Sequence, residues 1–198
     1  PVPWVAAVAD TWPGPIAHEY QRLRQVLEQG QIVAAIFQLK DVAEVLIKFP
    51  ALVMARDLIQ HGDAEAAATA RRGLFGGLLS LGTWASIVRE QLAPQVVRLT
   101  PAGRLLLPEL GTVFVAMGKA GQTPETPWLK TLCKLVEWRN AALGHGAFRL
   151  DPQEYLAELE KWLGDLNRHL AEQVERGLWA GAVLRGEAGS PPDLSGWR

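Results

Sequence analysis

The feature that most constrains the fold is a long apolar segment with helical periodicity. Its apolar residues recur at intervals of three and four positions, and they are Ile32, Ala35, Ile36, Leu39, Val42, Ala43, Leu46 and Ile47. This spacing places them on one face of an α-helix. Charged residues interrupt the segment as far as Ile59, so it does not reach the roughly 20 apolar residues that span a bilayer. The segment therefore predicts a buried helix and not a membrane span.

Pro50 lies in the middle of this helical pattern. Because proline removes one helical hydrogen bond, we expect a kink or a break there, with a helical continuation to about Gln60. Asp63 then precedes an Ala-rich stretch with Glu65 in its first turn. An aspartate in this position is typical of a helix N-cap, so a short helix is expected to begin here.

The remaining chain is also helical in pattern, with no alternating strand pattern and no internal repeat. Its clearest helix start is Asp151, Pro152 and Glu154, which combine a capping box with a proline in the first helical position. That helix is expected to reach about Arg176. Further helices are expected at 16–29, 74–92, 108–119 and 128–143, with loops at 93–108 and 121–127.

These patterns predict an all-α fold, a bundle of about five to six helices joined by short loops. A chain of 198 residues with 48% hydrophobic residues is long and apolar enough for one sizeable core. Residues 1–15, with four prolines, are expected to form an extended lead-in or linker. Residues 16–185 would form the helical domain, and 186–198 a loose tail or linker. Since the chain begins at Pro1, we expect a domain cut from a longer protein.

The residue composition of the chain limits the kinds of binding or catalytic site that it can form. A lone cysteine, Cys133, excludes an internal disulfide and a cysteine-rich zinc site, and it suits a cytoplasmic compartment. His18, His61 and His169 are isolated in the sequence, so we expect no metal and no cofactor. The net charge of −1 conceals an excess of six positive charges over residues 67–150. That segment would face a polyanion, unless the charges are spread over solvated helix faces.

The candidate site is the segment Glu137–Gly146, which places Arg139, Asn140 and His145 at the end of a helix. A histidine titrates near neutral pH and serves as a general acid or base. An arginine stays charged and grips phosphate oxygens through two donors. The asparagine would orient the histidine or bind a phosphate oxygen. The three side chains together suit cleavage of a phosphodiester.

An arginine and a polar residue followed by histidine after four intervening residues resembles the signature of HEPN domains, which are small all-α bundles. The helix Phe37–Phe49, with its acidic residues, is also similar to an early helix of some bacterial HEPN modules. The resemblance implies a metal-independent endoribonuclease in which a homodimer lines one cleft with its Arg139 and His145 pairs. It also implies an effector domain in a larger bacterial defence or toxin protein, controlled by a sensor domain.

Other interpretations stay open beside this one. The bundle would equally suit a non-catalytic adaptor that dimerises or binds a protein or nucleotide, and Arg139 and His145 would then be a helix cap and a turn. On a straight helix these two residues point about 120° apart, so a turn at Gly144 or a dimer must bring them together. The segment Leu99–Leu106 resembles part of a winged-helix repressor, which would imply DNA binding.

Four further residues are candidates for substrate binding, and they are Asp41, Glu44, Lys134 and Arg149. Asp41 and Glu44 are three positions apart, so on a helix they point into the same region and would reach Arg139 or a substrate. The alternative is a salt-bridged polar stripe with Lys40 and Lys48.

Overall fold

The computed structural model describes residues 4–77, 79–118, 122–143 and 152–180. Its elements are α1 (Ala6–Thr11), α2 (Gly14–Glu28), α3 (Ile32–His61), α4 (Ala64–Phe75), α5 (Leu81–Ile87), a π-helical turn (Val88–Leu92), α6 (Ala93–Leu99), a 3₁₀ turn (Thr100–Ala102), α7 (Glu109–Phe114), α8 (Pro127–Leu143) and α9 (Pro152–Glu175). The described part contains no strand beyond one isolated bridge between Val115 and Glu125. The predicted all-α class is confirmed, with more helices than the five to six expected.

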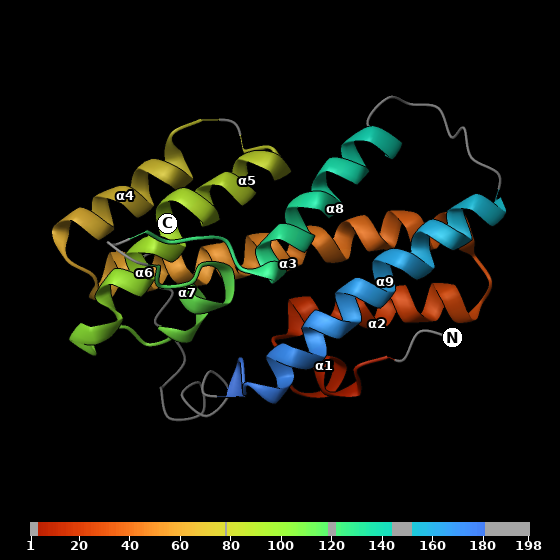
Figure 1. Ribbon diagram of the computed structural model, residues 1–198, viewed down its shortest axis with the longest axis horizontal. Coiled ribbons are helices and arrows are strands. Elements are labelled where there is room, and N and C mark those ends of the chain that lie inside the picture. Colours follow the sequence, from red (N-terminus) through yellow and green to blue (C-terminus); the bar gives the residue numbers. More distant parts are fainter. Residues whose placement is uncertain (1–3, 78, 119–121, 144–151, 181–198) are drawn as a thin grey trace, which may run out of the picture.

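The long helix α3 is the centre of the molecule (Figure 1). Helices α4 to α7 surround its C-terminal half, and α1, α2, α8 and α9 surround its N-terminal half. The apolar face predicted from the sequence is buried, since Ala35, Leu39, Val42 and Ile47 are almost inaccessible to solvent. Each helix thus buries its apolar side on α3 or on a neighbour of α3.

Pro50 does not break this helix. α3 runs through it as one element of 30 residues, and Pro50 itself is buried. An internal proline costs a helix about 3 kcal/mol, which the burial of residues on both sides of Pro50 offsets. Tertiary packing therefore overrides the local signal.

The predicted extended lead-in at 1–15 is wrong from Ala6 onward. Residues 6–11 form α1, which packs on α2 and α9 and buries Val8, while Trp12 is buried just after it. Pro15 stands in the first turn of α2, where a proline has no helical hydrogen bond to lose. Pro15 therefore belongs to the start of a helix and does not keep the chain extended.

The region between Phe75 and Glu109 also differs from expectation. The helix predicted at 74–92 is divided, because α4 ends at Phe75 and Ser80 caps the new helix α5 by accepting from the Thr83 amide at 3.1 Å. The predicted loop at 93–108 contains α6, with Pro94 in its first turn.

The segment Leu99–Leu106, compared above with a winged-helix repressor, contains a 3₁₀ turn and Gly103 at a φ of 65°. The short helix α7 follows it where a winged-helix domain would place strands.

Two predicted helix starts can be followed in the structure. The Asp63 carboxylate accepts a hydrogen bond from the Ala66 amide at 2.8 Å, which confirms the cap of α4. Helix α9 begins at Pro152, as predicted, and ends at Glu175. Asp151 lies outside the described residues.

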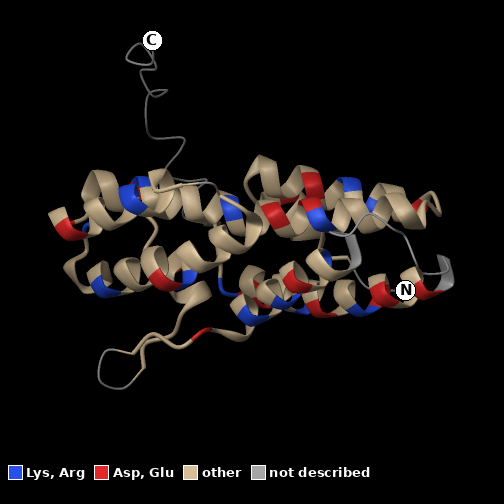
Figure 2. Cartoon of the chain, turned by 90° about the horizontal axis from the view of Figure 1, so that it is seen from above, with Lys and Arg blue, Asp and Glu red and all other residues tan. Residues whose placement is uncertain are grey.

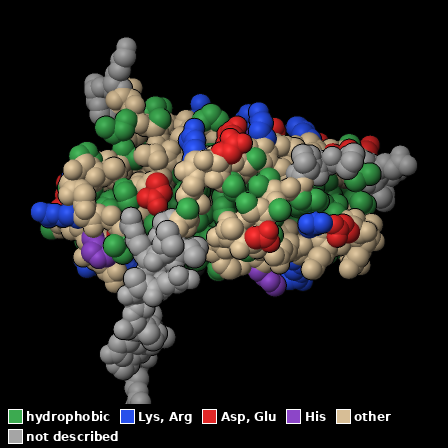
Figure 3. All heavy atoms as spheres, turned by 90° about the horizontal axis from the view of Figure 1, so that it is seen from below, with side chains coloured by type: hydrophobic (Ala, Val, Ile, Leu, Met, Phe, Trp, Pro, Cys, Tyr) green, Lys and Arg blue, Asp and Glu red, His purple; other side chains and the backbone are tan. Residues whose placement is uncertain are grey.

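Basic and acidic residues are interspersed along the helices (Figure 2). One face of the molecule carries a band of hydrophobic side chains with charged groups beside it (Figure 3). Large apolar side chains that remain exposed include Val33, Phe37, Leu52, Phe75, Leu106, Met117 and Leu156. In the described ranges, no helix has both the length and the apolar character needed to cross a membrane.

A buried carboxylate joins α3 to the segment before α7. Asp57 is 5% exposed, and its two oxygens accept the backbone amides of Leu106 at 2.9 and 3.0 Å and of Leu107 at 3.0 Å. His61, one turn further along α3, contacts the same carboxylate at 2.9 Å. These bonds give acceptors to two backbone amides that would otherwise be unpaired. Asp57 thereby fixes the position of the segment that leads into α7.

We predict that Asp57→Asn lowers the free energy of unfolding by about 2 kcal/mol, because the new amide group faces backbone donors that then lose their acceptor. Urea unfolding followed by circular dichroism measures the loss. The matched control is Asp165→Asn, which removes only an exposed pair with Arg168 and should cost less than about 0.5 kcal/mol. Equal effects of the two substitutions would contradict the anchoring role of Asp57.

Candidate functional site

The described part of the predicted motif lies in the last turns of α8. Arg139 is half-buried, and its Nη1 donates a hydrogen bond to the Asn140 side-chain oxygen at 2.9 Å. The Arg139 Nε is buried and has no hydrogen-bond partner among the described residues. The guanidinium is therefore held by its neighbour on one side and has an unused donor on the other.

The end of α8 is held against α9 by two indoles. The rings of Trp138 and Trp162 are 5.9 Å apart between centroids, at an interplanar angle of 49°. Trp162 is buried, and Trp138 packs against the core. This packing holds the turn of α8 that carries Arg139 against α9.

Glu44 on α3 lies within the electrostatic reach of Arg139. Partial burial acts to raise the pKa of Glu44, but the hydrogen bond and charge of Lys48, with the charges of Lys40 and Arg139, hold it below its ordinary value. The Lys48 Nζ lies 2.7 Å from the Glu44 carboxylate. Glu44 therefore remains ionised at neutral pH and balances the positive charge at the end of α8.

The salt-bridged stripe foreseen as an alternative is also present. Lys40 pairs with Asp41 at 2.8 Å and approaches Glu44 at 3.9 Å. Glu44 takes part in this salt-bridged stripe, and the charge of Arg139 also acts on it. The two interpretations of Glu44 therefore do not exclude each other.

The remaining predicted site residues either point away from Arg139 or fall outside the residues that the structure describes. Lys134 is exposed on α8, five positions before Arg139. On a helix that spacing points about 140° away, so the two side chains do not share a face. His145 and Arg149 lie outside the described residues.

Histidines that look isolated in the sequence have partners in the fold. His169 is buried on α9, with its Nε2 at 3.2 Å from the Thr131 hydroxyl of α8 and its Nδ1 at 3.1 Å from Glu172. The described ranges hold no group of three or more His, Cys, Asp or Glu residues that would hold a metal ion. Cys133 is half-buried and packs against the core, and burial raises the pKa of its thiol.

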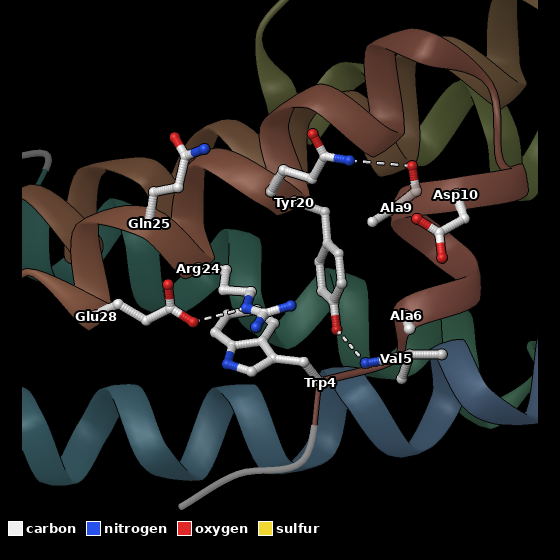
Figure 4. A pocket seen from close by; sticks show the side chains of 10 residues that line it. Trp4, Val5, Ala6, Ala9, Asp10, Tyr20, Arg24, Gln25 and Glu28 are labelled. Atoms are coloured by element: carbon white, nitrogen blue, oxygen red, sulfur yellow. Dashed lines mark hydrogen bonds and ion pairs between the residues drawn. The ribbon is translucent and has the colours of Figure 1, made fainter.

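A pocket that sequence reasoning missed lies between the N-terminal segment and α2 (Figure 4). It has a volume of about 270 Å³ and is lined by Trp4, Tyr20 and Arg24, among others. At its floor the buried Tyr20 hydroxyl accepts from the Val5 amide at 3.0 Å and donates to Asn167 of α9 at 2.7 Å. The only sequence signal for this pocket is the presence of two aromatic residues, Trp4 and Tyr20, whose rings are in contact. That contact depends on helix α1, which the sequence analysis did not predict.

Comparisons of the chain with protein-family models, with curated proteins and with solved structures found no match. The function therefore has to be argued from the residues themselves.

We predict that the Tyr20 phenol loses its proton at a higher pH than an ordinary tyrosine does. Burial raises its pKa to about 12, against the lowering effects of the Val5 amide and the Arg24 charge. Below pH 10 the phenol is neutral in both the folded and the unfolded chain. Between about pH 10 and 12 only the unfolded chain loses the proton, so the stability that Tyr20 contributes is lost over this range.

Phenolate absorbance of the folded protein, measured for the wild type and for Tyr20→Phe, isolates this group. The difference should show one tyrosine ionising near pH 12. A difference curve centred near pH 10 would contradict the buried position of Tyr20.

Proposed function

We propose that the chain is a HEPN-like endoribonuclease domain, which cleaves RNA without a metal ion by attack of a 2′-hydroxyl on the adjacent phosphorus. The observation that carries the proposal is the half-buried Arg139, whose Nε has no described partner although the Asn140 side chain holds Nη1. A buried donor without a partner costs about 1 to 3 kcal/mol, which an incoming acceptor would recover. A phosphate oxygen is such an acceptor.

In this reaction Arg139 stabilises the charge that develops on the phosphate. The guanidinium of an arginine offers donors in a rigid, planar arrangement that fits phosphate oxygens. Nη1 is committed to Asn140 and Nε is buried, so in this proposal the guanidinium turns its Nε edge outward to receive the phosphate. Asn140 thus orients the guanidinium, and the Trp138 contact with Trp162 holds their helix in place.

Glu44 and Asp41 suit a supporting role better than direct contact with RNA. An ionised carboxylate repels a phosphate, and the pKa of Glu44 is held below its ordinary value after the effect of burial is outweighed by Lys48, Lys40 and Arg139. Glu44 therefore balances and positions Arg139, while substrate binding falls to basic residues. Lys134 and Arg149 stay candidates for that task.

His145 supplies the proton transfer in this proposal. It follows Arg139 by six residues and stands between Gly144 and Gly146. As a base it takes the proton of the 2′-hydroxyl, whose oxygen then bonds to phosphorus while the bond to the 5′-oxygen breaks. The leaving oxygen is protonated, and the products are a 2′,3′-cyclic phosphate and a 5′-hydroxyl. DNA, which lacks the 2′-hydroxyl, would not be cleaved.

The wider setting follows from the same resemblance. The domain would act in the cytoplasm as a homodimer, as the effector of a bacterial defence or toxin protein that a sensor domain controls. If the protein dimerises without cleaving RNA, the adaptor function becomes the better account of the same bundle.

We predict that the purified protein cleaves single-stranded RNA in the presence of EDTA and leaves DNA of the same sequence intact. Arg139→Ala and His145→Ala should each lower the rate by about 10² to 10⁴-fold. Arg168→Ala, which removes an exposed arginine paired with Asp165, is the matched control and should keep full activity.

Circular dichroism of each variant verifies that the helices are intact, and analysis of the product ends identifies the cyclic phosphate. Full activity of folded Arg139→Ala or His145→Ala would sink the assignment.

A further inference from the structure

The pocket between the N-terminal segment and α2 has no part in the proposed function. We call it the Tyr20 pocket, and its lining contains no residue of α8. One wall is the segment 4–10, and the other is a face of α2 on which the lining residues recur at three and four positions. Its volume of about 270 Å³ lies just below the roughly 300 to 1,000 Å³ of pockets for drug-sized ligands. The pocket therefore suits a molecule of one ring with a short side chain.

Hydrogen bonds within the chain tie the two walls of the Tyr20 pocket together. The Val5 amide donates to the Tyr20 hydroxyl at 3.0 Å, and the Gln21 side-chain amide donates to the Ala9 backbone oxygen at 3.1 Å. The rings of Trp4 and Tyr20 are in edge contact, with 5.1 Å between their centroids. Because the walls are already held in place, a ligand does not have to order them when it binds.

The charged residues of the Tyr20 pocket leave one carboxylate without a partner. The Arg24 Nε donates to the Glu28 carboxylate at 2.7 Å, so these two charges balance each other. Asp10 has no hydrogen bond or ion pair with any residue that the structure describes. In Figure 4, Asp10 and Arg24 lie on opposite sides of the Tyr20 ring. With two acidic residues and one basic residue, the lining carries one net negative charge, and it belongs to the Asp10 end.

The Trp4 indole supplies the main apolar surface of the pocket. Trp4 is half-buried, whereas Tyr20 is only 2% exposed, so the indole is the ring that a ligand reaches. The small side chains of Ala6 and Ala9 lie in the same wall. The face of an indole attracts both the edge of another ring and a cation, because its π-system is negative above and below the ring. The lining thus combines an aromatic wall with an unpaired carboxylate.

We infer that the Tyr20 pocket binds a small aromatic amine, with its ring on the Trp4 indole and its ammonium group at the Asp10 carboxylate. The net negative charge of the lining attracts a cation and repels a phosphate or carboxylate compound. Arg24 repels a second cation, which directs the ammonium group to the Asp10 end of the pocket. The inference stands on this pocket alone and holds whether or not the chain cleaves RNA.

Three probes of nearly equal size separate the effect of charge from that of shape. Phenethylamine, 2-phenylethanol and phenylacetate carry a positive charge, no charge and a negative charge at neutral pH. Titrations of the isotope-labelled protein, followed by NMR at the Trp4 indole N–H, give the dissociation constant of each probe, and Trp4→Phe assigns that signal by removing it. We expect phenethylamine to bind about three- to fivefold more tightly than 2-phenylethanol, which is the effect of an exposed ion pair, and phenylacetate to bind most weakly.

Variants of the charged lining test where the ammonium group binds. Asp10→Asn should abolish the preference for phenethylamine over 2-phenylethanol without weakening the binding of 2-phenylethanol. The matched control is Asp165→Asn, which removes an exposed carboxylate of α9 and should keep the preference. Arg24→Gln should strengthen phenethylamine binding by about threefold, because it removes a repelling charge and frees Glu28. Damage to the fold would not strengthen binding, and circular dichroism verifies that each variant keeps its helices.

Equal dissociation constants for phenethylamine and phenylacetate would overturn the inference. An Asp10→Asn variant that still prefers phenethylamine would overturn it as well, and so would a Trp4 signal that none of the probes shifts at tens of millimolar. None of these measurements involves RNA, so this inference and the proposed ribonuclease activity fail separately.

Discussion

The burial of one helix organises this molecule. α3 is apolar on the faces that meet α2, α4, α8 and α9, and its inward residues are almost wholly removed from water. Each fully buried aliphatic side chain contributes about 1.5 to 3 kcal/mol, which is enough to keep the helix continuous across a proline. Because α2, α4, α8 and α9 each contact α3 more extensively than they contact any other helix, α3 also sets where the end of α8 lies.

The candidate site depends on that placement. Arg139 stands on α8 and Glu44 on α3, so the charge of Arg139 contributes to lowering the pKa of Glu44 because the two helices pack together. The indole pair of Trp138 and Trp162 fixes the same turn from the side of α9. Under the proposed function, the Arg139 Nε, which has no described hydrogen-bond partner, would bind a phosphate oxygen.

The sequence predicted the parts of the fold that depend on local periodicity. The faces of α3 and α8, the Asp63 cap and the start of α9 at Pro152 all followed from spacing and capping residues. It failed where a segment with prolines forms a helix, as in α1 and α6, and where burial overrides a helix breaker, as at Pro50. For the site, sequence reasoning named Arg139, Asn140 and Glu44 and raised the possibility that Glu44 reaches Arg139. It missed the Tyr20 pocket, because that pocket depends on helix α1.

The proposed function holds that two copies of the chain together form one RNA-cleaving site. The most direct test measures the cleavage rate per protomer over a range of protein concentrations, together with the fraction of dimer at each concentration. The account predicts that the rate rises in proportion to the dimer fraction and vanishes at dilutions where only monomer remains. A rate per protomer that is constant across this range would contradict it, because each chain would then carry a complete site of its own.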